Sequence, residues 1–126
     1  MSKQIISTPA APAAIGTYSQ AVRVGNTIWV SGQIPLDPAT KELVPGGFEA
    51  QAKQTFANVA AIVAAAGATL DDVVKVNISL TDLGNFAAVN AVMASHFREP
   101  YPARAAVGVA SLPRGALIEV ECIIAL

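Results

Sequence analysis

Charged side chains are scarce in this sequence. Only 13% of its 126 residues are Asp, Glu, Lys or Arg, whereas about 25% is usual in soluble proteins. Hydrophobic residues make up 53% of the chain, and its mean hydropathy is +0.50. We expect one domain, residues 1–126, with too few charges to cover its surface. Its apolar patches should therefore meet other copies of the chain in a closed, symmetric homo-oligomer.

Cysteine and histidine occur once each, as Cys122 and His96. A single cysteine excludes an intrachain disulfide and a thiolate cluster, and the two residues together are too few for an ordinary zinc or iron site, so we expect no metal. Cys122 falls on the apolar face of a predicted strand, and His96 lies in the last turn of a predicted helix. Both are therefore interpreted as structural.

Long apolar runs and clustered positive charge are missing too. The Ala-rich uncharged stretch between Lys53 and Asp71 is interrupted by polar residues and by Gly67, which argues against a membrane span. Residues 1–6 show no apolar signal-peptide core, so we expect a cytoplasmic protein. The net charge is −1, the pI is about 5.7, and the eight basic residues are scattered. This distribution argues against a nucleic-acid-binding surface.

The first half of the chain contains a hairpin pattern and a helix pattern. Two β-prone runs within residues 22–30 flank Gly25-Asn26, a dipeptide that suits a tight turn. Apolar residues then recur at helical spacing over 48–66, and Gly67 follows in the position that ends a helix.

The second half of the chain also contains both strand and helix patterns. Strands are expected at residues 73–80, 105–109 and 118–124, and a second helix over 86–97 begins at a cap provided by Asp82 or Asn85. The apolar face of the first of these strands is predicted to consist of Val74, Val76, Ile78 and Leu80. The order β-β-α-β-α-β-β predicts an α+β sandwich with the helices packed on one face of a mixed sheet.

Arg104 is the most informative charged residue, because it opens an otherwise small and apolar strand. A buried guanidinium needs an anionic partner, and its planar fork matches a carboxylate bidentately. That carboxylate is either brought by a ligand or supplied by Glu119 or Glu121; alternatively, the Arg104 side chain reaches out to water.

Glu119 and Glu121 share one face of the last strand, which we expect to lie beside the strand of Arg104. Two interpretations stay open: solvated surface carboxylates, or one carboxylate that positions a water molecule or shuttles a proton. Two loop segments are also candidates. One carries Tyr18, whose side chain either packs or lines a cleft, and the other carries Ser31 and Gly32, where the glycine lets a backbone amide approach a ligand.

Taken together, these residues resemble the reactive intermediate deaminase (RidA, YjgF-type) family over nearly the whole chain. The stretches that carry the resemblance are 13–20, 30–35, Gln51 with Asn58, 89–90, Tyr101-Pro102-Ala103-Arg104 and Ile118-Glu119-Val120-Glu121. The resemblance implies a chorismate-mutase-like α+β fold, a homotrimer with clefts between its subunits, and no cofactor. It also implies hydrolysis of reactive 2-imino or 2-enamino acids, such as 2-iminobutanoate and 2-iminopropanoate, to 2-oxo acids and ammonia. Pyridoxal-phosphate-dependent dehydratases release these intermediates.

By position, the resemblance assigns Arg104 to the substrate carboxylate, and Tyr18 and Glu119 to the cleft, with Glu119 beside the attacking water. The remaining positions in the cleft are Ser31, Gly32, the backbone of Ala106, and Asn90, whose role stays open. Two residues depart from the family pattern: Thr17 stands in place of a common proline, and Ala106 in place of a cysteine found in some members, which removes any mechanism based on a thiol there. The alternative function is a non-catalytic regulatory protein that binds small carboxylates in the same cleft.

Overall fold

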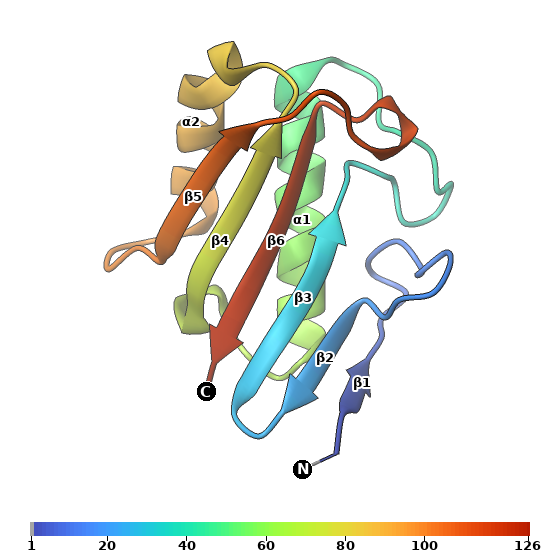
Figure 1. The fold of residues 1–126 in the computed structure, drawn as a ribbon, viewed down its shortest axis with the longest axis vertical. Coiled ribbons are helices and arrows are strands. Elements are labelled where there is room, and N and C mark those ends of the chain that lie inside the picture. The colour runs from blue at the N-terminus through green and yellow to red at the C-terminus, as the bar shows by residue number, and fades with distance from the viewer. Residues whose placement is uncertain (1) are drawn as a thin grey trace.

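A computed structural model describes residues 2–126, and this part of the chain forms one six-stranded mixed sheet (Figure 1). The strands are β1 (Gln4–Ile6), β2 (Ala21–Val24), β3 (Thr27–Gln33), β4 (Val73–Leu80), β5 (Ala103–Gly108) and β6 (Ile118–Ala125). Their order across the sheet is β1-β2-β3-β6-β4-β5. All neighbouring strands are antiparallel except β4 and β5, which are parallel.

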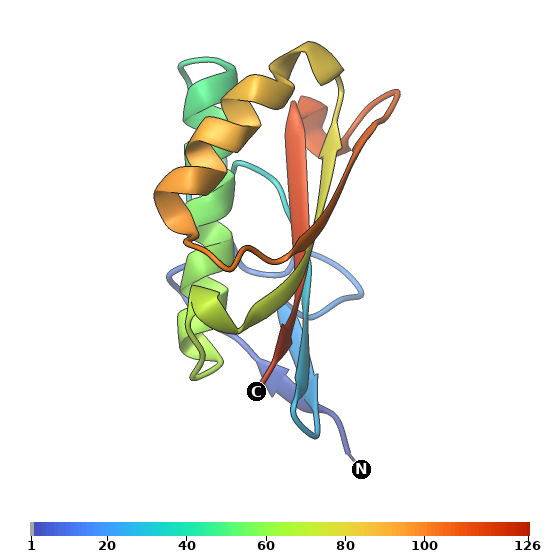
Figure 2. The ribbon, with the colours of Figure 1, turned by 90° about the vertical axis from the view of Figure 1, so that its left-hand side faces the viewer.

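Both α-helices of the described chain, α1 (Phe48–Ala65) and α2 (Phe86–His96), cover one face of this sheet (Figure 2). Short 3₁₀ turns lie at η1 (Leu70–Asp72), η2 (Leu83–Asn85) and η3 (Pro113–Gly115). Neither α1 nor α2 has the length and apolar character needed to cross a bilayer. The predicted α+β sandwich with helices on one face of a mixed sheet is confirmed.

The observed elements follow the predicted order, with one addition. The strand β1 pairs with β2 and was not expected from the sequence. The hairpin of β2 and β3 turns at Gly25, whose φ is +61°, as the Gly25-Asn26 pattern indicates. Gly67, with φ +78°, follows the end of α1 as predicted. Asp82 does not cap α2 directly: its carboxylate accepts a hydrogen bond from Gly84 N and so caps η2, which leads into the helix.

The position of β5 corrects one expectation. The strand of Arg104 was expected beside the strand of Glu119, but β4 lies between β5 and β6. The physical reason is the crossover through α2, which places β5 parallel to β4 at the outer edge of the sheet, while β6 returns antiparallel on the inner side.

The start of β4 corrects a second expectation. Val74 was predicted on the apolar face, but its side chain is 45% exposed, whereas Val73 is buried. A register shift between Val73 and Lys75 in the pairing with β6 explains the difference. Such a bulge moves one residue out of alternation, so the core position passes from Val74 to Val73.

The hydrophobic core lies between the sheet and the two helices. Ile118, Val120, Cys122 and Ile124 line the core side of β6, as predicted, and Glu119 and Glu121 lie on its other face. Burial, and to a smaller extent the charge of Glu121, raises the pKa of the Cys122 thiol to about 12, which keeps it unreactive. His96, in the last turn of α2, stacks on Phe56. Cys122 and His96 therefore both have the structural role expected of them.

Candidate functional site

Glu119 lies next to Gly32 on the sheet face that the helices leave uncovered. The pairing of β3 with β6 shifts register between Val30 and Gln33, and Gly32 lies within that irregularity. A Cβ on Gly32 would lie 2.5 Å from Glu119 Oε1 and 2.8 Å from Glu119 Cδ. The glycine was expected to admit a ligand to the backbone. That expectation stays a prediction; the structure adds that Gly32 also makes room for the Glu119 carboxylate.

The environment of Glu119 favours its neutral form. Partial burial raises the pKa of the Glu119 carboxyl above its ordinary value of 4.5, and the negative charge of Glu121 raises it further. Asn77 on β4 donates a hydrogen bond from Nδ2 to Glu121 Oε1 at 3.3 Å. A carboxyl whose pKa is raised holds its proton more readily and is suited to accept and return a proton during a reaction.

Glu119 and Tyr18 line the same hollow, which we call the Glu119 pocket. It has a volume of about 530 Å³, and Ser31, Gly32, Ile15, Glu121 and Arg114 are among its other lining residues. Ile15 N donates to the Tyr18 hydroxyl at 3.2 Å, so the phenol also organises its own loop. The Ser31 hydroxyl donates to the Ser19 carbonyl at 2.5 Å and thereby ties β3 to that loop. Four predicted site residues thus meet in one pocket.

Three buried amide side chains hold the walls of the Glu119 pocket. Gln20 Nε2 donates to Pro12 O at 2.8 Å, and Gln20 Oε1 accepts from Thr8 N at 2.7 Å. Asn58 Nδ2 donates to Ile34 O at 3.3 Å and to Leu36 O at 3.0 Å. Gln51 Oε1 accepts from Leu117 N at 2.9 Å. Each amide therefore hydrogen-bonds the backbone of a different segment, which lies in the pocket wall or directly beside it.

No role for Gln20, and none for Arg114 in this pocket, was predicted from the sequence. A polar amide directly before the apolar run of β2 is a signal for a buried, fully bonded side chain, and Gln20 is 3% exposed. Arg114 follows Pro113 in η3 and has φ +61°, a conformation that sequence patterns rarely reveal for arginine.

Arg104 lies elsewhere, on the helix side of the edge strand β5. Its Nη1 donates to Asn90 Oδ1 on α2, and its Cζ lies 4.9 Å from the centroid of the Phe86 ring. Arg104 is exposed in the single chain and makes no contact with Glu119 or Glu121, so of the alternatives left open by the sequence a ligand carboxylate or water remains. A second hollow of about 480 Å³, the Arg104 pocket, is lined by Asn90, Met93, Ala94, Tyr101, Pro102 and Arg104.

The two pockets belong to different parts of the protomer. Arg104 pairs in register with Val76, whose side chain is in the core under the helices, whereas Glu119 projects from the opposite face of the sheet. Ala106 shares the side of Arg104 and packs against the core. One chain therefore brings Tyr18, Ser31, Gly32 and Glu119 together, and Arg104 with Asn90, but does not join the two groups.

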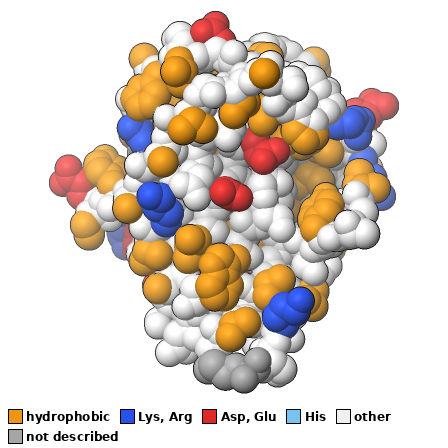
Figure 3. Space-filling model, viewed as in Figure 1, with side chains coloured by type: hydrophobic (Ala, Val, Ile, Leu, Met, Phe, Trp, Pro, Cys, Tyr) orange, Lys and Arg blue, Asp and Glu red, His pale blue; other side chains and the backbone are white. Residues whose placement is uncertain are grey.

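The uncovered sheet face combines acidic and apolar side chains. Figure 3 shows this face, with acidic side chains near its middle and hydrophobic ones around them. Trp29 is 46% exposed and Val107 is 52% exposed, so apolar side chains on this face are open to solvent in the single chain. No group of three or more His, Cys, Asp and Glu side chains that could hold a metal ion is found within residues 2–126.

Comparison with known proteins identifies relatives along nearly the whole chain. The family model described as endoribonuclease L-PSP matches residues 8–126. The 2-iminobutanoate/2-iminopropanoate deaminase of Dermatophagoides farinae is 52% identical over 122 residues, 97% of this chain and 95% of the mite protein. The crystal structure of RidA from an Antarctic Psychrobacter species is 58% identical, with a TM-score of 0.94 over 98% of this chain and 99% of that one.

A further solved relative contains a bound ligand. Escherichia coli TdcF with bound serine is 42% identical to this chain, with a TM-score of 0.92 over 98% of each chain. The chain therefore belongs to the endoribonuclease L-PSP family, and its resemblance to the reactive intermediate deaminases is confirmed.

Proposed function

We propose that this protein hydrolyses 2-iminobutanoate, 2-iminopropanoate and their enamine tautomers to 2-oxo acids and ammonia. The observation that carries the proposal is the 52% identity, over 97% of the chain, to a protein named for that deaminase activity. The site is consistent with it, because Glu119 and Tyr18 line one pocket while Arg104 presents a guanidinium at the edge of the sheet.

The chemistry requires few functional groups. The C=N carbon of an imino acid is electrophilic, and protonation of the nitrogen makes it more so. Water adds to this carbon to give a carbinolamine, which loses ammonia as the C=O bond of the 2-oxo acid forms. The protein has to orient the substrate, hold the water and move protons.

Arg104 binds the substrate carboxylate in this proposal. A guanidinium offers two parallel N–H groups to the two carboxylate oxygens, an arrangement that fixes the orientation of the C=N group as well as its position. Escherichia coli TdcF, solved with bound serine, is a relative whose ligand carries such a carboxylate.

Glu119 handles the water and Tyr18 completes the pocket. The raised pKa of the Glu119 carboxyl suits a group that takes a proton from water and returns it to the departing nitrogen. Backbone groups near Ser31, Gly32 and Ala106 complete the pocket in this proposal, and none of these steps needs a cofactor.

The site is completed between subunits of a homotrimer in this proposal. Arg104 and Glu119 lie on different faces of one chain, so a second copy must bring its Arg104 to the Glu119 pocket. The exposed Trp29 and Val107 on the uncovered sheet face support an interface there. A cytoplasmic location, expected from the sequence, stays a prediction that cell fractionation would test.

The decisive experiment couples a threonine or serine dehydratase to the purified protein and follows the disappearance of the imine. Wild-type protein should accelerate that disappearance, and Arg104→Ala should lose most of the acceleration, by about 100-fold, because a charged hydrogen-bonded contact is removed. No acceleration by wild-type protein would refute the deaminase function. In that case, retained binding of a 2-oxo acid would support the alternative of a carboxylate-binding regulatory protein.

A further inference from the structure

One face of α2 contacts the Arg104 guanidinium at three points. The Phe86 ring lies 4.9 Å from Arg104 Cζ, Asn90 Oδ1 accepts from Nη1, and Met93 Sδ lies 3.9 Å from Nη1. Phe86, Asn90 and Met93 have the spacing i, i+4 and i+7, which puts them on one side of the helix. We call these three residues the α2 cradle.

The cradle occupies one nitrogen of the guanidinium and its flat face. Within residues 2–126, Nε and Nη2 of Arg104 have no hydrogen-bond acceptor. In a guanidinium, Nε–H and one N–H of Nη2 point the same way and fit the two oxygens of a carboxylate side-on. The cradle therefore leaves open the edge that can bind a carboxylate at two points.

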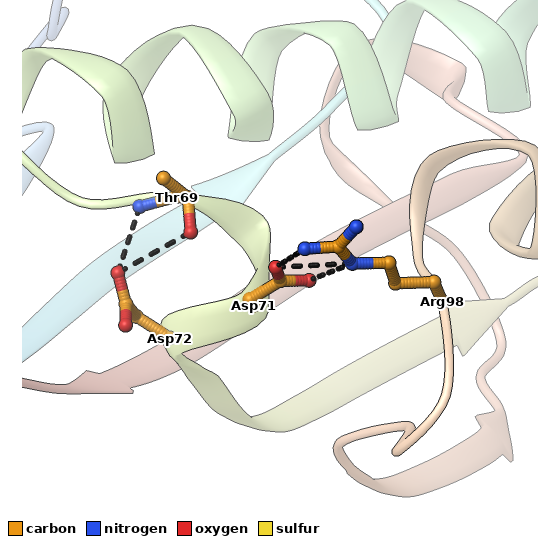
Figure 4. Close-up of polar contacts among 4 residues, drawn as sticks. All are labelled: Thr69, Asp71, Asp72 and Arg98. Atoms are coloured by element: carbon orange, nitrogen blue, oxygen red, sulfur yellow. Dashed lines mark hydrogen bonds and ion pairs between the residues drawn. The ribbon is translucent and has the colours of Figure 1, made fainter.

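The same chain shows this side-on geometry in a complete pair. Arg98 Nε donates to Asp71 Oδ1 at 3.0 Å, and Arg98 Nη2 donates to Asp71 Oδ2, as Figure 4 shows. The Arg98 and Asp71 side chains are 80% and 47% exposed, so the pairing forms without help from a buried environment. Arg104 differs in that residues 2–126 supply no partner on the corresponding edge.

We propose that Phe86, Asn90 and Met93 are positioning residues that hold Arg104 by its Nη1 and its face, so that Nε and Nη2 bind the substrate carboxylate side-on. The proposal deepens the proposed function, because the carboxylate is that of the imino acid. An arginine held before the ligand arrives loses less rotamer entropy on binding. Asn90 is suited to this task because its neutral amide oxygen holds the guanidinium without cancelling its charge.

The first test concerns the aromatic face and uses calorimetric binding of 2-oxobutanoate. Phe86→Leu should weaken binding about threefold, because an exposed cation–π contact is lost while an apolar side chain remains. Phe86→Tyr keeps the ring and should bind within about 1.5-fold of wild type. Phe86→Leu should raise KM and Phe86→Tyr should leave it nearly unchanged, and kcat should change little in either variant. Equal binding by Phe86→Leu and wild type, or equal weakening by both variants, would refute the role of the ring.

The second test concerns the charge at position 90. Asn90→Asp places a carboxylate on Nη1 and should weaken 2-oxobutanoate binding at least about tenfold at neutral pH, because the guanidinium is already neutralised. The matched control is Ala91→Asp, which adds the same charge to an exposed position one residue along α2. Its binding should stay within about twofold of wild type. Equal effects of the two variants would mean that Asn90 has no specific role.

The third test reads the binding edge directly by NMR of ¹⁵N-labelled protein. The Arg104 Nε–H signal, assigned by its absence in Arg104→Lys, should move downfield and become protected when 2-oxobutanoate binds, as charge-assisted hydrogen bonding predicts. A bound state in which only Nη signals respond would refute the side-on arrangement. Because this readout needs no turnover, it separates the two proposals: the Nε–H response without imine hydrolysis would support the cradle and refute the deaminase function.

Discussion

Gly32 shows how one missing side chain shapes this site. The space that a Cβ would take is filled by the carboxylate of Glu119, at 2.5 Å from the position of that Cβ. Because the carboxylate is the far end of a flexible side chain, it can move away at little cost to the fold. Gly32 therefore matters more for the position of the Glu119 carboxylate than for the stability of the fold.

Gly32→Ala tests that distinction. We expect the substitution to lower the rate of imine hydrolysis about tenfold or more, because the Glu119 carboxylate is displaced, while thermal unfolding changes by only a few degrees. The control is Gly67→Ala, at a positive φ of +78° with open space around the Cβ position. It should lose about 1 kcal/mol of stability through backbone strain and keep its activity. If Gly32→Ala lost stability but kept its activity, Gly32 would have no role in the site.

The pair of carboxylates on β6 makes a pH prediction. Burial raises the pKa of Glu119 first, and Glu121 adds a like-charge contribution. Glu121→Gln removes that charge, so the Glu119 pKa should fall part of the way back toward 4.5. If ionised Glu119 activates the water, the acidic limb of the pH dependence of kcat should move to lower pH in Glu121→Gln.

The raised pKa of Glu119 also makes the stability of the fold depend on pH in a definite direction. A carboxyl with a raised pKa binds its proton more tightly in the folded state, so the stabilisation from Glu119 is present below pH 4.5 and is lost as the pH rises through its folded pKa. Urea denaturation of Glu119→Gln should therefore show a gain relative to wild type that grows over this window. An unshifted acidic limb in Glu121→Gln would show that Glu119 is not the group that titrates.

At the scale of elements, α1 does more than fill the core. Its buried face presents Gln51 and Asn58, which bond to backbone groups of the segments around the Glu119 pocket. The helical spacing of apolar residues predicted α1 itself. It did not reveal these polar contacts, because their partners are 22 or more residues away in the sequence.

Asn58→Ala should destabilise the protein by about 1–3 kcal/mol, because the carbonyls of Ile34 and Leu36 lose a buried donor. Urea denaturation measures this change. Gln54→Ala serves as the control. Within residues 2–126 the Gln54 side chain bonds the Asn58 side chain alone, from a half-buried position, so its loss should cost less than about 1 kcal/mol. Equal losses of stability in the two variants would show that the hydrogen bonds from Asn58 to the carbonyls of Ile34 and Leu36 contribute little.

At the scale of the molecule, the separation of Arg104 and Glu119 on one chain predicts complementation between variants. Arg104→Ala and Glu119→Gln should each be nearly inactive alone. When the two are unfolded together and refolded at equal ratio, about a quarter of intersubunit sites in a cyclic trimer receive both intact residues. Activity should return to roughly that fraction of wild type. A mixture as inactive as its components would place the whole site within one chain.

The mass in solution tests the assembly independently. Native mass spectrometry should find a species of three chains, each of 12.9 kDa. Trp29→Asp places a charge on the uncovered sheet face, where we expect the interface, and should shift the population toward monomer with loss of activity. A wild-type monomer that hydrolyses imines at full rate would refute both the trimer and the shared site.

Sequence patterns alone predicted the order of helices and strands except for β1, the core face of β6, and the residues that resemble a deaminase site. These features depend on local periodicity and on short motifs, which neighbouring residues in the chain specify. Three features became visible only in the folded chain: β4 lies between β5 and β6, Val73 replaces Val74 in the core, and Arg104 contacts α2 away from Glu119. Strand order, bulges and side-chain partners depend on contacts between distant segments, and those form only when the whole sheet packs against its helices.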